Sequence, residues 1–195
     1  MSLHQLIERN PLVLILLATI TVLIGTIVTM LYPMFRPEMH PKLEGLKPYT
    51  ALQLAGRDIY QREGCFYCHT QTVRPLKTEV LRYGEYSKAG EFAYDRPFLW
   101  GSKRTGPDLA RIGGKYPDEW HYKHFENPQA FFPQSNMPKY GFLKERKLNP
   151  KQIEAHMKAL GFPYTKEEIE ALKDKTEMDA LVAYMQVLGT AVKKQ

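Results

Sequence analysis

The chain has 195 residues and a net charge of +6 at pH 7, with 27 Lys or Arg and 21 Asp or Glu residues. A chain of this length usually forms one globular domain with an appendage. The basic residues form no run, which gives little support to nucleic-acid binding. The mean hydropathy of −0.41 is polar although 44% of the residues are hydrophobic, so strongly apolar segments must be local.

The first predicted element is a membrane-spanning helix over residues 11–32. This segment of 22 residues carries no charge, and at about 1.5 Å per residue it measures about 33 Å, enough to cross a bilayer core of about 30 Å. A cleaved signal peptide would have an apolar region of about 7–15 residues and a small-residue cleavage site. The run is longer and residues 30–35 contain no such site, so we predict an uncleaved anchor.

A proline-rich segment follows the anchor. Residues 33–49 contain four prolines, and because proline fixes φ and lacks an N–H group, we predict an extended connector. The predicted organisation is therefore an N-terminal segment with the anchor (1–32), a linker (33–49) and a globular domain (50–195).

Helical periodicity begins near Ala51 and leads into the segment that holds both cysteines, Cys65-Phe66-Tyr67-Cys68-His69. The C-x-x-C-H pattern is typical of c-type haem attachment, in which two thioethers form and the histidine ligates the iron. One turn of chain brings both sulfurs to one porphyrin edge. The cysteines alone would also fit a redox dithiol, a disulfide or half of a zinc site, but the chain has no second cysteine pair to complete a zinc site.

Three helices are predicted in the last third of the chain. One starts at Asn149-Pro150 and ends at Gly161, and a second opens with a capping box over residues 165–168. The third lies between an N-cap at Thr176 and a left-handed stop at Gly189. We see no catalytic constellation among them.

Besides His69, several methionines and histidines are candidate metal ligands. Met178 and Met185 lie in the last predicted helix and are expected in the core, whereas Met157 lies on an amphipathic helix. His121 and His124 are three residues apart on a predicted surface helix, and we expect both to be solvated.

The globular domain resembles class I cytochromes c. Gly56 and Tyr60 stand in a G-x-x-x-[FY] pattern before the haem motif, and Leu181 and Tyr184 stand in an L-x-x-Y pattern in the last helix. The resemblance implies a mainly α protein whose all-α haem domain has crossing first and last helices. The small residue at position 56 would allow their close contact.

The same resemblance assigns the remaining site residues. The Gly-Pro-x-Leu run at residues 106–109 implies that the Pro107 carbonyl accepts a hydrogen bond from the His69 ring, which fixes the ring and raises its basicity, and that Leu109 packs on the haem. Met137-Pro138 implies that Met137 is the second axial ligand, and Met/His ligation raises the haem potential. The predicted cofactor-binding residues are Cys65, Cys68, His69, Pro107, Leu109 and Met137, of which His69 and Met137 bind the metal.

A 35-residue insertion, residues 70–104, separates the haem motif from the Gly-Pro run. Long loops are usually functional or disordered, and the aromatic content of this one argues against disorder. The insertion, together with GCFYCHTQTVRP, GGKYPDEWHYKHFENP and SNMPKY, closely resembles the FixO/CcoO family. Its members are mono-haem, membrane-anchored cytochrome c subunits of cbb3-type cytochrome c oxidases.

This family resemblance implies a non-catalytic electron-transfer subunit with one covalently bound haem c. Electrons would come from a di-haem cytochrome c subunit or a soluble cytochrome c and pass to haem b of the catalytic haem–copper subunit, where oxygen is reduced. We expect the part of the insertion from Arg74 to Arg104 to dock onto the catalytic subunit; the alternative is that it only shields the haem edge.

Charge and haem chemistry give opposite predictions for the orientation of the anchor. Arg36, Lys42 and Lys47 follow the anchor, whereas Arg9 and Glu8 precede it, so the positive-inside rule would place the domain in the cytoplasm. Covalent haem attachment, however, occurs outside the bacterial inner membrane, and long domains translocate largely regardless of charge. We therefore predict a single-pass inner-membrane protein with a cytoplasmic N-terminus and a periplasmic haem domain.

Two other functions stay open from the sequence. A free-standing membrane-anchored electron shuttle would use the same haem without a partner in the bilayer. A haem peroxidase would need an open iron position, which His69 and Met137 together would close.

Overall fold

The computed structural model describes residues 3–39 and 41–192, which form helices and loops, with one isolated bridge between Lys147 and Thr176. The chain is therefore mainly helical, as predicted. It divides into two units, Met1–Pro41 and Lys42–Gln195. Each is described by itself.

The N-terminal unit is built around one long apolar helix. After α1 (Leu3–Arg9), helix α2 (Pro11–Thr26) continues through a π-helical turn (Ile27–Leu31) into α3 (Tyr32–Phe35), and a 3₁₀ turn (Pro37–Met39) follows. Helix α2 begins where the Asn10 side chain accepts from the backbone N–H groups of residues 12 and 13.

The apolar span Pro11–Phe35 has 25 residues and is long and apolar enough to cross a membrane. It extends past the predicted end at Tyr32, because Pro33 lies in the first turn of α3, where a missing N–H group costs little. Thr21 and Thr29 donate their hydroxyls to the carbonyls of Leu17 and Gly25 at 2.9 and 2.7 Å. The helix thus satisfies these polar groups internally, as a lipid environment requires.

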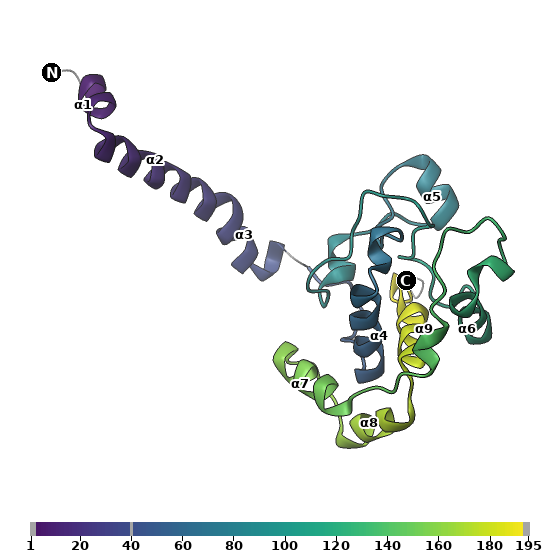
Figure 1. Ribbon diagram of the computed structural model, residues 1–195. Helices are drawn as coiled ribbons and strands as arrows, with labels where there is room; N and C mark the ends of the chain where they lie inside the picture. Colours follow the sequence, from purple (N-terminus) through teal and green to yellow (C-terminus); the bar gives the residue numbers. More distant parts are fainter. Residues whose placement is uncertain (1–2, 40, 193–195) are drawn as a thin grey trace. The chain divides into compact units, whose positions relative to one another are not determined.

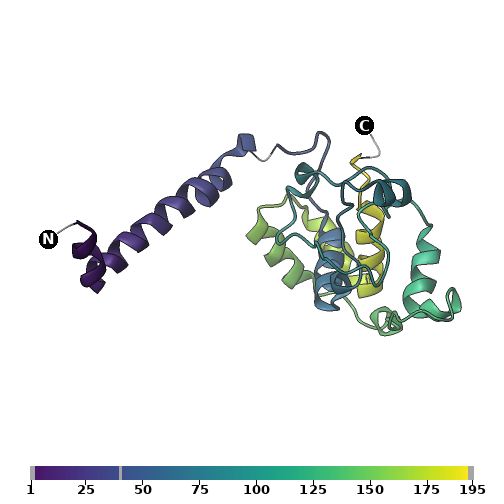
Figure 2. The same cartoon turned by 90° about the horizontal axis from the view of Figure 1, so that it is seen from above.

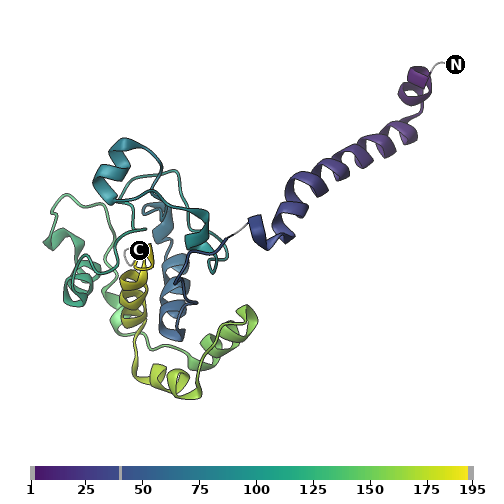
Figure 3. The same cartoon turned by 180° about the vertical axis from the view of Figure 1, so that it is seen from behind.

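Two helices, α4 (Ala51–Arg62) and α9 (Glu177–Val187), cross at the centre of the C-terminal unit (Figure 1). Each begins with a complete capping box, Thr50 with Gln53 and Thr176 with Asp179. The views from above and behind show the same pair side by side, with the other helices and loops of this unit around it (Figures 2 and 3). The chain leaves α9 through Gly189 at φ +72°, the predicted left-handed stop.

Gly56 makes the close crossing possible. A Cβ atom at this position would lie 1.9 Å from the Ala180 carbonyl oxygen and 2.7 Å from the Tyr184 Cβ, so a side chain cannot fit between the helices without moving one of them. Tyr184 is fully buried, and its ring contacts Tyr60 and Tyr49 edge-on, with centroid distances of 5.6 and 5.8 Å. The predicted crossing of the first and last helices is confirmed.

Two supporting helices, α7 (Pro150–Leu160) and α8 (Lys166–Ala171), pack near the start of α4. Helix α7 begins at the Asn149 cap and ends at Gly161, as predicted, and α8 follows. The capping box predicted for α8 is only half formed. Thr165 accepts from the Glu168 N–H group, but the Glu168 carboxylate accepts from the Ala51 N–H group at 2.7 Å and so joins α8 to the start of α4.

Helix α5 (Lys77–Tyr83) and a 3₁₀ turn (Ala89–Phe92) lie within the insertion, and α6 (Asp118–Glu126) lies beyond it. The methionines of α7 and α9, Met157, Met178 and Met185, are buried in the core. For Met178 and Met185, this confirms the prediction.

The prediction that His121 and His124 are solvated was wrong. The inner face of α6 is aromatic: His121 is buried, with its ring near those of Trp120 and Phe125, and the half-buried His124 stacks on Trp120 at 4.7 Å. Burial lowers the pKa of His124 to about 4, so its ring is uncharged at neutral pH and packs as an aromatic group.

We predict that Gly56→Ala lowers the free energy of unfolding by about 1–3 kcal/mol, as overpacking of a core does. Alanine has a helix propensity about 1 kcal/mol better than glycine, so a net loss would show that the crossing decides the outcome. The measurement is denaturant unfolding of the detergent-solubilised chain, followed by circular dichroism. Gly141→Ala is the control, because a Cβ there meets its nearest neighbours only at 4.0 Å; a neutral Gly56→Ala would contradict the close-contact argument.

Candidate haem site

The haem motif forms a single tight turn at the end of α4. Gly64, at φ +71°, reverses the chain into a 3₁₀ turn (Cys65–Tyr67). The N–H groups of Cys68 and His69 then donate to the Cys65 carbonyl at 3.2 and 2.8 Å. This geometry places both sulfur-bearing residues and the histidine on one turn, as the spacing predicted.

The two cysteines are not joined in the structure. Cys65 is half-buried against the core and Cys68 is exposed. Burial, and then the nearby Glu63 carboxylate, raise the pKa of the Cys65 thiol to about 12. A reactive dithiol needs a thiolate at neutral pH and hence a lowered pKa, so the environment of Cys65 argues against a redox dithiol.

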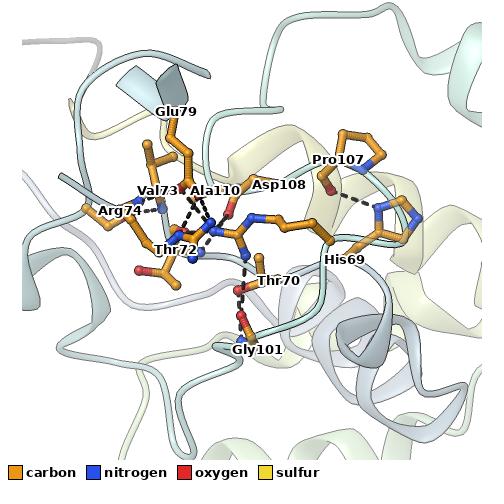
Figure 4. Close-up of polar contacts among 12 residues, drawn as sticks. His69, Thr70, Thr72, Val73, Arg74, Glu79, Gly101, Pro107, Asp108 and Ala110 are labelled. Carbon is orange, nitrogen blue, oxygen red and sulfur yellow. Dashed lines mark hydrogen bonds and ion pairs between the residues drawn. The ribbon is translucent and has the colours of Figure 1, made fainter. Parts of the chain in front are cut away.

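The His69 ring is held by a backbone carbonyl. Its Nδ1 donates to the Pro107 oxygen at 2.9 Å, the bond expected from the sequence (Figure 4). With Nδ1 protonated, Nε2 carries the free lone pair that a metal needs. Burial lowers the pKa of His69, and the bond to Pro107 only partly offsets this effect, so the neutral, ligating form is favoured. Gly106 leaves room for the ring, since a Cβ there would lie 2.2 Å from Cε1 of His69.

Backbone hydrogen bonds clasp the two loops around this histidine. Gly106 N–H donates to the Cys68 carbonyl and Leu109 N–H donates to the Thr70 carbonyl, both at 3.0 Å. The buried Asp108 carboxylate accepts from the Thr72 N–H group at 3.0 Å (Figure 4). We call segments 68–72 and 106–109, joined in this way, the proximal clasp.

An ion cluster that the sequence did not indicate covers the outer side of the proximal clasp. Glu79, on α5, accepts from Arg74 Nε at 2.5 Å and from Arg104 at 3.0 Å, and Arg104 also donates to the Thr72 carbonyl at 3.0 Å. Desolvation opposes the ionisation of Glu79, but the two arginines outweigh it and lower its pKa to about 2. Asp108 lies 3.8 Å from Arg104. Because Glu79 and Arg104 are 25 residues apart, no local motif could reveal the cluster.

Leu109 and Met137 are both half-buried against the hydrophobic core. Met137 lies in the loop between two 3₁₀ turns, Pro128–Ala130 and Gly141–Lys144. Its N–H group donates to Ser135 Oγ at 3.2 Å, and its carbonyl accepts from Gln129 Nε2 at 2.8 Å. His156, another histidine of the domain, lies 2.8 Å from Asp58 and is accounted for by that contact.

The insertion is ordered and attached to α4. Arg57 is buried and donates to Asp95 at 2.7 Å, and the Tyr49 hydroxyl donates to the same carboxylate at 3.0 Å. Phe98 and Trp100 stack at 4.6 Å, and 51% and 43% of their surfaces are exposed. The insertion thus has a fixed base and an aromatic outer face.

A comparison with models of protein families matches residues 4–176 to the family described as cytochrome c oxidase, mono-heme subunit/FixO. The match spans most of the chain. The chain belongs to the FixO family. A comparison with curated proteins found no match. Membership of the FixO family implies one haem and a part in electron transfer within a cytochrome c oxidase.

The donor set of this FixO chain fits a single haem. Cys65, Cys68 and His69 lie on one turn, and His69 Nε2 has no hydrogen-bond partner among the described residues. Over residues 3–39 and 41–192, no group of three or more His, Cys, Asp or Glu side chains could hold a metal ion. A zinc site made of protein ligands alone therefore has no support.

We predict that Glu79→Gln lowers the free energy of unfolding at pH 7 by about 1 kcal/mol, the size expected for an ion pair of this kind. Because the folded-state pKa of Glu79 lies near 2, below its usual value, its contribution is present above the usual carboxyl pKa and is lost as the pH falls towards 2. The measurement is denaturant unfolding at several pH values between 7 and 3.

Glu170→Gln is the matched control for this change, since Glu170 is exposed and has no ion-pair partner within the described part of the chain. A Glu79→Gln effect that does not shrink on acidification would show that the carboxylate charge is not what stabilises the cluster.

Proposed function

We propose that the chain is the electron-transfer subunit of a cbb3-type oxidase and carries one haem c bound through Cys65 and Cys68, with His69 and Met137 as axial ligands. The observation that carries the proposal is the bond from His69 Nδ1 to the Pro107 carbonyl, made on the same turn that presents both cysteines. It gives the imidazole a defined tautomer and a defined direction before any metal is bound.

Each residue has a distinct task in this proposal. Cys65 and Cys68 tether the porphyrin, His69 supplies a neutral nitrogen, and Pro107 raises the basicity of that nitrogen. Met137 supplies a soft thioether that favours the reduced iron and raises the potential. When bound, the haem supplies a one-electron couple. With both axial positions filled by the protein, oxygen and peroxide have no site, so the subunit itself is not catalytic.

The proposed location is the bacterial inner membrane, with a cytoplasmic N-terminus and a periplasmic haem domain. The apolar span Pro11–Phe35 supports a single-pass anchor. The orientation follows from the chemistry of covalent haem attachment, as argued from the sequence, and a protease-protection assay on spheroplasts would test it.

The proposed partners are the catalytic haem–copper subunit, which receives the electron at haem b, and a di-haem cytochrome c subunit or a soluble cytochrome c, which supplies it. The insertion supports docking onto the catalytic subunit, because exposed aromatic residues are enriched at stable interfaces. Its acidic side chains pair within the domain, as Glu79, Glu91 and Asp95 do with arginines. The partner would therefore meet the aromatic residues together with Lys77, Arg96 and Lys103, which are exposed and have no ion-pair partner within the described part of the chain.

The first experiment is purification of the chain from membranes with haem and metal analysis. We predict a thioether-bound haem with a Met–iron charge-transfer band and no carbon monoxide binding.

The double variant Cys65→Ala/Cys68→Ala should lose covalent haem, because no sulfur is left to bind the vinyl groups. Met137→Ala should keep the haem but bind carbon monoxide, because one axial position opens. A wild-type chain that binds carbon monoxide would overturn the ligand assignment, and purification without a haem b and copper subunit would favour the free-standing shuttle.

The docking proposal gives a second test. We predict that Phe98→Ser/Trp100→Ser reduces co-purification of the catalytic subunit at least tenfold while the haem content is unchanged, because interface aromatics contribute most of the binding energy when buried. Phe142→Ser is the control, as Phe142 is a partly exposed aromatic outside the insertion. An intact complex with the double variant would leave only the shielding role for this face.

A further inference from the structure

The two predicted axial ligands are held in different ways. His69 lies in the proximal clasp, whose two segments are joined by backbone bonds at 3.0 Å and by the Pro107 bond. Met137 lies in a loop, residues 133–138, whose only backbone–backbone bond in the described structure is from Ser135 N–H to the Phe132 carbonyl, at 2.8 Å. The backbone alone therefore does little to fix the methionine.

The Gln129 side chain provides the hydrogen bonds that the backbone of this loop does not make. Gln129 Nε2 donates to the Ser135 carbonyl at 3.0 Å and to the Met137 carbonyl at 2.8 Å. Only the NH₂ end of an amide can donate to two carbonyls, so the orientation of the Gln129 amide is determined by its partners. The Met137 N–H group in turn donates to Ser135 Oγ at 3.2 Å, which closes a small ring of bonds around the methionine backbone.

The base of this brace is rigid. Gln129 lies in the 3₁₀ turn Pro128–Ala130, directly after the fully buried Pro128. The Pro128 carbonyl accepts from the N–H groups of Phe131 and Phe132 at 3.1 and 3.0 Å. The amide thus connects a buried, well-bonded turn to a loop that has few bonds of its own.

We propose that Gln129 is the positioning residue for the Met137 ligand: its amide holds the backbone of residues 135–137 so that the thioether stays on the iron. This inference rests on the proposed function. A thioether is a weak donor, so its bond to iron alone does not offset the conformational entropy that a loose loop loses when it is ordered. A brace that orders the loop in advance removes that cost, and the fraction of time the methionine is bound rises accordingly.

The test uses the full-length, haem-loaded chain in detergent, with imidazole as a competitor for the sixth iron position. In Gln129→Glu the shape is kept, but an ionised carboxylate cannot donate to either carbonyl; Gln129→Leu removes the amide altogether. Both variants should bind imidazole about tenfold more tightly than the wild type, since the competitor displaces a less well held methionine; tenfold corresponds to about 1.4 kcal/mol. The Met–iron charge-transfer band should weaken in parallel, and the reduction potential should fall.

The matched control is Gln134→Leu, because Gln134 is an exposed glutamine of the same loop with no hydrogen bond in the described structure; it should leave all three readouts unchanged. If Gln129→Leu fails to load haem, Gln129→Glu still gives the comparison. A wild-type chain without the Met–iron band would refute the ligand assignment of the proposed function. A wild-type chain with the band, together with Gln129 variants that bind imidazole like the wild type, would refute the brace alone.

Discussion

The structure depends above all on the proximal clasp, in which segments 68–72 and 106–109 bond to each other around the His69 ring. A histidine on a turn would otherwise sample several ring orientations and both tautomers. The Pro107 carbonyl removes that freedom with one bond of 2.9 Å, and the flanking backbone bonds keep the carbonyl in place. The fixed orientation of this proposed ligand thus comes from main-chain atoms, which cannot change rotamer.

The crossing of α4 and α9 gives the clasp a rigid base. The Tyr60 hydroxyl donates to the His69 carbonyl, and the Tyr184 hydroxyl donates to Gln71 at 2.9 Å, so each crossing helix sends one tyrosine to the chain that follows the haem motif. Both tyrosines are fully buried, and their rings also contact each other. Packing at Gly56 and the geometry of the turn at His69 are therefore linked through two aromatic side chains.

Local signals in the sequence predicted the ends of α9, with its N-cap at Thr176 and its stop at Gly189. The resemblance to class I cytochromes c implied the close contact at Gly56 and the bond between His69 and Pro107. Other features depend on partners that the fold alone brings together. Glu168 caps α4 instead of its own helix, and the Glu79 cluster joins residues from three segments.

The burial of His121 contradicts the prediction for a different reason. A histidine at i, i+3 spacing with another polar residue fits an exposed face, and nothing within α6 contradicts that interpretation. The turn after α6 brings Phe131 against Trp120 and His124, at 5.4 and 5.9 Å, and this packing encloses the inner face of the helix. The contacts of Gln129 could not be predicted from the sequence for the same reason, because its two acceptors are neighbours only in the folded loop.

The insertion adds a large surface without disturbing His69, and the arrangement of its ends explains how. Gln71 N–H donates to the Leu99 carbonyl at 3.2 Å, and Gly101 N–H donates to Thr70 Oγ1 at 2.8 Å. The insertion therefore closes on itself directly beside His69, and since closure entropy grows only slowly with loop length, a long insertion costs little more than a short one. Trp100 lies between Leu99 and Gly101, which are bonded to Gln71 and Thr70. A partner bound to the aromatic face would therefore contact a segment that is bonded to the residue after His69. Docking would bring that partner close to the proposed haem.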